Sequence, residues 1–360
     1  MSKLDFGIYA IGGVVKTFMD YRFDLDVSIL LEVRKYLTPS RPLHMFGLGL
    51  PTFFSLAVAC GADTFDSAAY ILYAKDGRYF SHTGTKNIND LIEFPCNCPV
   101  CAKYTPKELQ QTDKAQQLQL LASHNLYFSF AELKTIRQSI REGTLWDLVE
   151  QRVQAHPKLV EAFGIIRKHP EYFNQLINTN KVKGLKESNF GLHYRPEVLK
   201  AIDRLAQYAI PKEKTMLVFL PELDLPSKSS KMVSKWIEDI TKSPKQNEIQ
   251  IFLVSNLFGA IPFELMEIYP LHQHESIMNK PLNQIMAQQL EENICKIIIS
   301  NQNNLHKLSI LVPNQIRNQF NEEIHFESRF HLISSMQSLL SNKFARSEEH
   351  TSELQSPNTI

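Results

Sequence analysis

The sequence has few cysteines, little net charge and no long hydrophobic run. Its 360 residues include five cysteines and carry a formal net charge of +1, with 21% charged and 43% hydrophobic residues. An odd number of cysteines argues against a disulfide framework, and the small net charge gives no strong basic footprint for a nucleic acid. No apolar run reaches the roughly 18 residues that span a bilayer. This composition is that of an ordinary globular protein, and the length indicates two domains.

The N-terminal segment, "MSKLDFGIYAIGG", lacks the charged head and long apolar core of a signal peptide. The sequence therefore predicts a cytoplasmic protein without a membrane partner. Clustered thiols in a reducing cytosol bind metal or take part in redox chemistry more often than they form disulfides. A dinucleotide fingerprint is excluded at "FGLGLP", because Gly47 and Gly49 lack the third glycine of G-x-G-x-x-G.

Three of the five cysteines lie within six residues, in "EFPCNCPVCAKYTPKEL". Cys96, Cys98 and Cys101 follow a C-x-C-x2-C spacing, and deprotonated sulfurs so close repel one another unless a cation neutralises them. Zinc does so with four ligands in a tetrahedron. Cys60 and Cys295 lie in apolar runs and are predicted to be small buried hydrophobic residues. The spacing therefore predicts a zinc site whose fourth ligand comes from elsewhere.

A helix is predicted to open at "TPKE", with Thr105 as N-cap and Glu108 closing a capping box. His124, in "LASHNLYF", is expected just after this helix, from where it could return a ligand to the cysteine loop. An ordinary polar histidine is nevertheless the preferred interpretation from position alone. The residues by themselves leave the fourth ligand open.

Strand-like and helical patterns alternate in the first hundred residues. The runs "FGIYAIGG" and "LHMFGLG" are separated by a helical pattern, and a second one precedes "DTFDSAAYILYA". Such alternation predicts βαβ units in a parallel sheet or barrel, although two or three strands are too few to close either. Residues 105 to about 186 are predicted to be helical, with further starts at "SFAE" and "TLWD".

A second α/β unit is expected from about Phe190. Its predicted strands are "TMLVFLP" and "EIQIFLVS", with a helix over "SKMVSKWIEDITK" between them and a loop over "GAIPFELMEIYPLHQHE" after them. The tail is different, because "RSEEHTSELQS" resembles the translation of a sequencing-library adapter. Residues 346–360 are therefore interpreted as an artefactual or disordered tail and excluded from the fold.

Several motifs together resemble the archaeal tRNA-guanine transglycosylases. They are "YAIGG", "HMFGLGLP", "GADTFDSAAYILYAKDGRYF", "PCNCPVCAKYTPKEL" and "SHNLY". Those enzymes exchange a guanine in the tRNA D-loop for 7-cyano-7-deazaguanine, on the route to archaeosine. The resemblance implies tRNA and guanine or 7-cyano-7-deazaguanine as partners and Zn²⁺ as cofactor. It also implies an α/β fold: the C-terminal portion of a TIM (β/α)8 barrel with a zinc-binding helical insertion over 1–187, followed by a smaller α/β domain over 188–345.

The resemblance also assigns roles to particular residues. Asp66 matches the family nucleophile, which attacks the ribose anomeric carbon; by itself, a strand-end aspartate is more often a cap or turn former, and Asp63 fits that interpretation better. Gly12, Gly13 and Val14 match a segment whose backbone approaches the base, although a turn before a helix explains two glycines equally well. The implied zinc ligands are Cys96, Cys98, Cys101 and His124.

Departures from the family leave alternatives open. The family barrel begins with strands whose carboxylates and amide recognise the base, and this sequence is expected to start after them and to lack the tRNA-binding PUA domain. The chain is therefore expected to be a truncated or split part of the enzyme, inactive alone, that assembles with a complementing barrel half or with itself. A non-catalytic tRNA-binding or scaffold paralogue is the alternative, which the presence of Asp66 disfavours. Archaeosine synthase ranks lower, because Glu222 stands where that paralogue has a cysteine.

Overall fold

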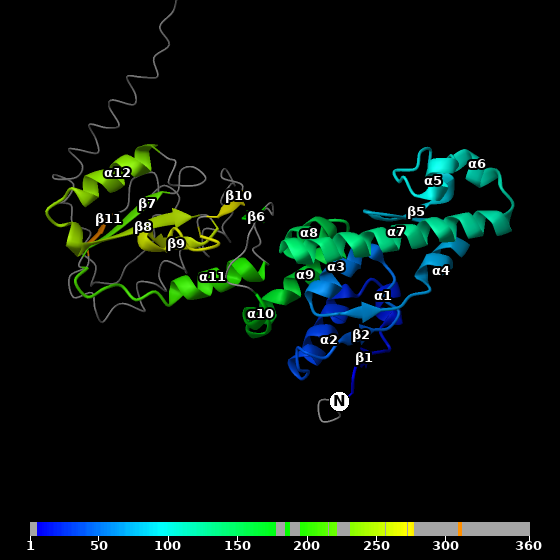
Figure 1. The fold of residues 1–360 in the computed structure, drawn as a ribbon, viewed down its shortest axis with the longest axis horizontal. Helices are drawn as coiled ribbons and strands as arrows, with labels where there is room; N and C mark the ends of the chain where they lie inside the picture. Colours follow the sequence, from blue (N-terminus) through cyan, green and yellow to red (C-terminus); the bar gives the residue numbers. More distant parts are fainter. Residues whose placement is uncertain are drawn as a thin grey trace, which may run out of the picture. The chain divides into compact units, whose positions relative to one another are not determined.

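The structure is a computed structural model that describes residues 6–177, 184–187, 195–214, 216–221, 231–255, 257–271, 273–276 and 309–311 (Figure 1). Glu222, Cys295 and the tail from 346 lie outside these residues. The chain divides into two compact units. Unit 1 comprises Met1–Asn189 with His193–Lys200, and unit 2 comprises Phe190–Leu192 with Ala201–Ile360. No helix in the described segments has the length and apolar character needed to cross a membrane.

Unit 1 is built on a sheet of three parallel strands in the order β1-β2-β3. The strands are β1 (Tyr9–Ile11), β2 (Leu43–Met45) and β3 (Thr64–Phe65). The register places His44 opposite Thr64. Helices α1 (Val15–Met19) and α2 (Phe23–Lys35) connect β1 to β2, and α3 (Pro51–Ala59) connects β2 to β3. Because the strands are parallel, their carboxyl ends meet at one edge, and this edge positions the candidate site.

The helices beside this sheet follow from their apolar patterns. Helix α2 buries Phe23, Val27, Leu30 and Leu31, which share one helical face, while acidic residues occupy its first turn and basic residues its last. Helix α3 starts with Pro51 and is buried over most of its length, as expected for a helix that is apolar on all sides. Helix α8 (Leu145–Val153) packs on α3, and α9 (Pro157–Gly164) packs on α2.

A mainly helical segment, called the insertion below, follows β3. It contains α4 (Ala69–Lys75), the antiparallel hairpin β4 (Arg78–Ser81) and β5 (Gly84–Asn87), the 3-10 helix η1 (Ile88–Asp90), α5 (Pro99–Lys103), α6 (Pro106–Gln111) and α7 (Lys114–Glu142). Helices α4 and α5 pack on α7 (Figure 1). The insertion has its own apolar cluster, in which Tyr79, Ile88 and Leu121 are buried.

The capping box at Thr105 and Glu108 is confirmed, but the helix that it opens is shorter than predicted. Helix α6 ends at Gln111, because Asp113 caps a new helix by accepting hydrogen bonds from the backbone of Ala115 and Gln116. His124 therefore lies inside α7 rather than after a helix, and the start predicted at "SFAE" is wrong, since this segment also lies within α7. Gly143 ends α7 in the left-handed conformation, with φ of 70°.

The described helical segments of unit 1 after α7 are α8, α9, the 3-10 helix η2 (Ile165–Lys168), α10 (Pro170–Leu176) and the start of α11 (Pro196–Ala206). Strand β6 (Leu185–Glu187) corrects the prediction of helix up to residue 186. The predicted start at "TLWD" is confirmed, because α8 begins at Leu145, yet Thr144 makes no side-chain cap. Asp147 instead forms an ion pair of 2.6 Å with the buried Arg195.

Unit 2 contains a four-stranded sheet in the order β11-β7-β8-β9. The strands are β7 (Met216–Pro221), β8 (Ile249–Ser255), β9 (Gly259–Pro262) and β11 (Ser309–Leu311). Strands β7 and β8 are parallel and are joined through α12 (Lys231–Thr241), as predicted, with the 3-10 helix η4 (Gln246–Glu248) before β8. The segment predicted as a loop instead forms β9, antiparallel to β8, then the 3-10 helix η5 (Phe263–Leu265) and β10 (His274–Ser276). The α/β class is confirmed, and membership of an eight-stranded barrel remains a prediction.

Candidate active site and metal centre

The carboxyl edge of the β1-β2-β3 sheet brings together residues that are far apart in the sequence. Gly12 and Gly13 follow β1, Gly47 lies just after β2, and Asp66 directly follows β3. The ends of β1 and β2 lie so close that a Cβ atom on Gly47 would be 2.4 Å from Val15 Cγ2. Gly47 also has a positive φ of 73°, which side chains rarely adopt. The residues predicted for base binding and for nucleophilic attack thus lie at one edge.

Asp66 presents an exposed carboxylate at this edge, with 62% of its side chain accessible. Its Oδ1 accepts a hydrogen bond of 3.1 Å from the backbone N–H of Gly47. The same oxygen lies 3.3 Å from His44 Nε2. Since both contacts fall on Oδ1, Oδ2 is the oxygen available for attack on an electrophile. An accessible carboxylate held through one oxygen suits a nucleophile.

His44 was not singled out in the sequence, although it lies in the "HMFGLGLP" motif. Its Nδ1 is 2.9 Å from Thr64 Oγ1, on the neighbouring strand. A carboxylate only accepts hydrogen bonds, so the contact with Asp66 places the proton of a neutral His44 on Nε2; Nδ1 then accepts from the Thr64 hydroxyl. The ring orients Asp66. A polar residue between two buried ones in "LHM" is the signal that could have identified it.

The Gly12–Val14 turn has the geometry that a close backbone approach requires. Gly12 and Gly13 are exposed, and Gly13 has a positive φ of 79°. The side chain of Val14 is buried, so Val14 offers only its backbone at the start of α1. A side chain on Gly13 would be strained in this conformation. The turn therefore leaves peptide groups accessible beside Asp66's edge of the sheet.

The second candidate site is a metal centre within the insertion. The ligand atoms of Cys96, Cys98, Cys101 and His124 lie within 4.8 Å of one another. His124 Nδ1 is 3.5 Å from Cys98 Sγ and 3.4 Å from Cys101 Sγ. The long helix α7 carries His124 to the cysteine loop, which α5 partly forms. Three thiols and an imidazole are a ligand set typical of tetrahedral zinc.

The surroundings of His124 fix which nitrogen faces the thiols. Its Nε2 lies 3.0 Å from the carbonyl oxygen of Phe80 and donates to it, which leaves Nδ1 with a lone pair for a metal. The ring stacks on Tyr79 with centroids 3.7 Å apart, and Tyr79 in turn stacks on Phe94. His124 is only 1% exposed. Backbone and aromatic contacts thus hold the imidazole in an orientation suited to a ligand.

The thiols influence one another strongly. The hydrogen bond from Cys101 and, to a smaller extent, the contact with His124 lower the pKa of Cys98 to about 3, despite burial. The hydrogen bond to Cys98 and burial raise the pKa of Cys101, and burial raises the pKa of Cys96. Three adjacent sulfurs therefore do not lose their protons together unless a cation neutralises them. Cys60, in contrast, is fully buried as predicted, and burial raises the pKa of its thiol.

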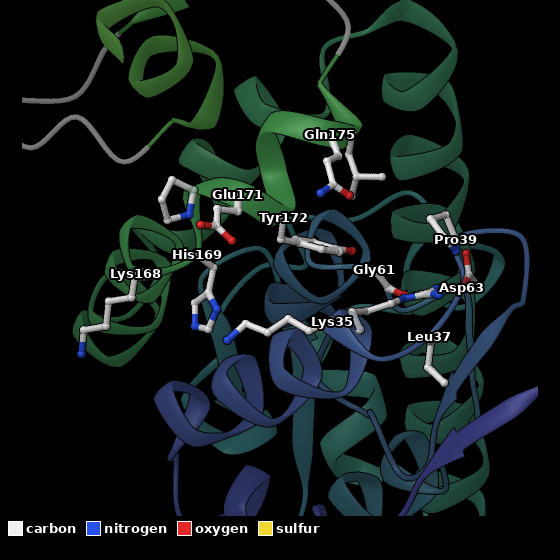
Figure 2. A pocket seen from close by; sticks show the side chains of 13 residues that line it. Lys35, Leu37, Pro39, Gly61, Asp63, Lys168, His169, Glu171, Tyr172 and Gln175 are labelled. Carbon is white, nitrogen blue, oxygen red and sulfur yellow. Dashed lines mark hydrogen bonds and ion pairs between the residues drawn. The ribbon is translucent and has the colours of Figure 1, made fainter. Parts of the chain in front are cut away.

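Asp63 lies at the opposite end of β3 from Asp66 and is structural. It accepts from the Leu43 N–H at 2.8 Å and pairs with Arg34, whose Nε also donates to the Gly61 carbonyl at 2.8 Å. These contacts are long-range, so Asp63 is held by a neighbouring strand and by Arg34 rather than by the local cap or turn bond that the sequence favours. Arg34 and Asp63 border a cavity of about 770 Å³ (Figure 2). The other charged or titratable side chains that line it are Lys35, Lys168, His169, Glu171 and Tyr172.

Comparisons with known proteins agree with this arrangement. Residues 1–158 match the family model of queuine tRNA-ribosyltransferase. A tRNA-guanine(15) transglycosylase of Methanocaldococcus jannaschii is 41% identical over 278 residues, which cover 76% of this chain and 41% of the relative. Relatives of the same name are 34% identical over 355 residues in Methanococcus aeolicus, and 39% identical over 278 residues in Methanobrevibacter smithii.

These matches cover 92% and 77% of this chain, and 53% and 42% of the two relatives. The chain thus spans about half the length, or less, of the curated relatives that it matches. Within that span, the strand ends, the cysteine loop and the helix that carries His124 all fall in the part matched by the family model. The part of the chain that these comparisons match belongs to the tRNA-guanine transglycosylase family.

Proposed function

We propose that this chain supplies the nucleophile, the base-binding turn and the metal centre of a tRNA-guanine transglycosylase, a pentosyltransferase. The observation that carries the proposal is the position of Asp66: an exposed carboxylate at the carboxyl edge of parallel strands, held by Gly47 and His44 beside the Gly12–Val14 turn. Active sites of (β/α)8 barrels lie at this edge. Residues 1–187 would form the barrel portion and residues 188–345 a smaller α/β domain.

The proposed reaction is a double displacement at the ribose anomeric carbon. Asp66 Oδ2 attacks C1′ of a tRNA guanosine, the C1′–N9 bond breaks, and guanine leaves with the bonding electron pair. The incoming base then attacks C1′ through N9, gives up its N9 proton and releases the carboxylate; this proton balances the one that the departing guanine takes up at N9, and two inversions preserve the configuration. Accessible peptide groups at Gly12 and Gly13 suit contact with a flat base. We propose 7-cyano-7-deazaguanine as the incoming base, in the archaeosine pathway of the cytoplasm.

We propose that the metal is Zn²⁺ and that it has a structural role. Cys96, Cys98, Cys101 and His124 supply four ligands, a number that leaves no position open for water or substrate. When bound, the ion would join the cysteine loop to α7. The Phe80 carbonyl would keep the His124 imidazole in the ligating tautomer.

The experiment that tests the function is exchange of labelled guanine into tRNA. We would assay the chain alone and mixed with a polypeptide that carries the remaining part of the M. jannaschii relative. Exchange is expected in the mixture, and Asp66→Asn should reduce it by on the order of 10³-fold or more, because a neutral amide cannot attack C1′. Asp76→Asn, at another exposed aspartate of unit 1, serves as the matched control. Undiminished exchange by Asp66→Asn would refute the nucleophile, and tRNA binding without exchange would favour the scaffold paralogue.

A further inference from the structure

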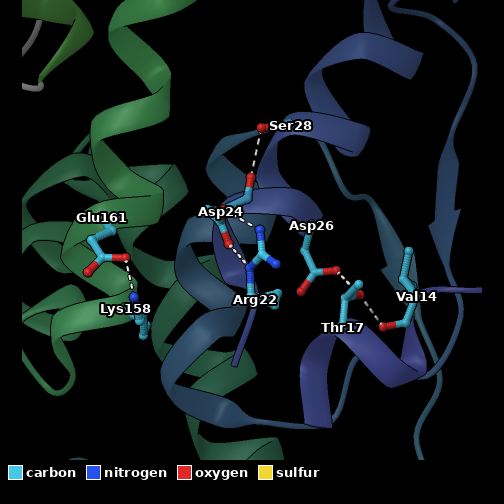
Figure 3. A network of polar contacts seen from close by, with 8 residues as sticks. All are labelled: Val14, Thr17, Arg22, Asp24, Asp26, Ser28, Lys158 and Glu161. Atoms are coloured by element: carbon cyan, nitrogen blue, oxygen red, sulfur yellow. Dashed lines mark hydrogen bonds and ion pairs between the residues drawn. The ribbon is translucent and has the colours of Figure 1, made fainter. Parts of the chain in front are cut away.

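A series of hydrogen bonds from Asp26 through Thr17 to Val14 supports the turn that we assign to base binding. Thr17 Oγ1, on α1, lies 2.6 Å from the Val14 carbonyl oxygen and also forms a hydrogen bond with Asp26 Oδ1, on α2 (Figure 3). Asp26 is fully buried. The Val14 carbonyl has a second donor, because the Phe18 N–H lies 3.1 Å from it. The Thr17 hydroxyl therefore links the end of the turn to a carboxyl group in the core.

The hydrogen bonds that link Asp26, Thr17 and Val14 can be satisfied together only if Asp26 carries a proton. A threonine hydroxyl has one hydrogen to donate. The Val14 carbonyl only accepts, and so does an ionised Asp26, so that one hydrogen would have to serve two acceptors. If Asp26 is a carboxylic acid, its O–H donates to Thr17 Oγ1 and the Thr17 hydroxyl donates to Val14. Both contacts are then satisfied.

The surroundings of Asp26 agree with a neutral group. Its second oxygen, Oδ2, is buried without a hydrogen-bond partner among the residues that the structure describes. Leaving a buried anion with an unpaired oxygen is costly, and much more so than leaving a neutral carbonyl oxygen unpaired. Burial raises the pKa of Asp26 from 3.8 to about 7, although the hydrogen bond from Thr17 opposes this shift.

No buried cation compensates the charge of an ionised Asp26 among the described helices that pack on α2. The buried cation of α2 itself, Arg34, lies near the other end of the helix and pairs with Asp63. At the start of α2, Asp24 raises the pKa of Asp26, and the exposed Arg22, which is paired with Asp24 at 3.0 Å, lowers it by less. Helix α3 has no charged residue. The charged residues on the other packed helices are exposed: Lys16 on α1, Lys158 and Glu161 paired with each other on α9, and Arg167 and Lys168 on η2.

We propose that Asp26 is a positioning residue of the base-binding turn: as a neutral acid it donates through Thr17 to the Val14 carbonyl, and its ionisation withdraws the Thr17 hydrogen from that carbonyl. The proposal rests on the assignment of Gly12–Val14 to base binding. An ionised Asp26 takes the only Thr17 hydrogen for itself. The Val14 peptide group then keeps only the Phe18 bond, and the turn that contains Gly12 and Gly13 is less firmly held.

One peptide bond reports this coupling without any assay of activity. Val14–Val15 is the only Val–Val pair in the sequence. Valine labelled with ¹³C at the carbonyl and with ¹⁵N therefore gives a single directly bonded ¹³C–¹⁵N pair, which belongs to Val14 and Val15. We would follow its carbonyl shift from pH 5 to pH 9 and, in parallel, the carboxyl ¹³C signals of labelled aspartate. The signal missing in Asp26→Asn identifies Asp26.

The expected result is that the Asp26 carboxyl titrates near neutral pH and that the Val14 carbonyl shift follows the same curve. Asp26→Asn supplies an amide donor that does not titrate, so the Val14 shift should be flat with pH. Thr17→Val should uncouple Val14 from Asp26, and Thr17→Ser should restore the coupling. Asp24→Asn, in the same helical turn but outside the hydrogen-bonded chain, should leave the coupling intact. Titration of Asp26 near its ordinary value, or a Val14 shift that ignores it, would overturn the proposal.

The reconstituted exchange reaction separates this proposal from the proposed function. The KM for guanine should rise by about fivefold between pH 6 and pH 8.5, the effect of one lost hydrogen bond, and Asp26→Asn should abolish this rise relative to Asp24→Asn. Coupling seen by NMR without any exchange would refute the function and leave the hydrogen-bonded chain in place. Exchange with a KM whose pH dependence is the same in Asp26→Asn would refute the positioning role alone.

Discussion

His44 Nε2 lies 3.3 Å from Asp66 Oδ1. His44 is on β2, and Asp66 directly follows β3, the neighbouring parallel strand. The register that sets His44 opposite Thr64 also brings Asp66, two residues further on, within reach of the ring. Thr64 occupies the other ring nitrogen at 2.9 Å. Strand pairing therefore fixes the rotamer of His44, and His44 in turn fixes Asp66.

Replacing His44 by Phe should lower kcat/KM for guanine exchange by about 10- to 100-fold, because a hydrogen bond to a charged group is lost while the ring shape is kept. The measurement is exchange of labelled guanine by the reconstituted enzyme. His82→Phe, at an exposed histidine of unit 1, is the control. An unchanged rate in His44→Phe would show that Gly47 alone is sufficient to orient Asp66.

The contact between His44 and Asp66 also illustrates what sequence patterns cannot supply. The position of Asp66 after a strand was visible in "DTFD", but its partner 22 residues earlier depends on the parallel register. The same holds for Asp147, predicted within a helix-start motif but paired with Arg195, 48 residues later. Sequence rules that consider only neighbouring residues assign such a carboxylate to a helix cap or turn, because they do not include partners far away in the sequence.

Local chemistry was predictable where neighbouring residues decide it. The capping box at Thr105 formed as expected, since both of its partners lie within one turn. The end of that helix was not predicted, because Asp113 competes as an N-cap for a new helix. Strand β9 differs from the prediction because Gly259 and Pro262 indicate a loop; an edge strand tolerates proline, and β9 is at the edge among the described strands of its sheet.

The metal centre likewise combines ligands that local sequence predicts with one that depends on tertiary structure. The spacing of Cys96, Cys98 and Cys101 pointed to a cation on chemical grounds. His124 was proposed only through the family resemblance, since its place on α7 and its bond to the Phe80 carbonyl depend on tertiary packing.

Replacing Cys98 by Ala should remove zinc from the purified chain, because three remaining ligands no longer close a tetrahedron. The zinc content should fall from about one per chain to near zero, and α5, α6 and the cysteine loop should lose protection from proteolysis, since metal binding and local folding are coupled. Metal analysis and limited proteolysis measure these effects. Cys60→Ala, at a buried cysteine far in sequence from the cluster, should keep its zinc. Stoichiometric zinc in Cys98→Ala would contradict the ligand assignment.

Stability should depend on pH through Asp26. Its pKa is 3.8 as an ordinary value and about 7 in the folded protein, so the folded state binds more protons than the unfolded state between these values. The free energy of unfolding should therefore fall as the pH rises from about 4 towards 7, and this part of the pH dependence should be complete above about 7. Urea unfolding at a series of pH values measures it. The difference in the free energy of unfolding between Asp26→Asn and wild type, followed against pH, isolates the contribution of Asp26. The same pH dependence in both proteins would mean that Asp26 does not titrate in this range.

Two aspartates at the ends of β3 should give opposite results when replaced by alanine. Asp63 accepts the Leu43 N–H and pairs with Arg34, whose side chain is only 6% exposed, so Asp63→Ala leaves buried donors without this acceptor. We expect a loss of about 2 kcal/mol in the free energy of unfolding. Asp66 is largely accessible, and Asp66→Ala should change stability by no more than about 0.5 kcal/mol while abolishing guanine exchange. Urea unfolding and the exchange assay together measure both effects. A strong loss of stability in Asp66→Ala, or a loss of exchange in Asp63→Ala at temperatures where that variant stays folded, would contradict the assignment of one structural and one catalytic carboxylate to the two ends of this strand.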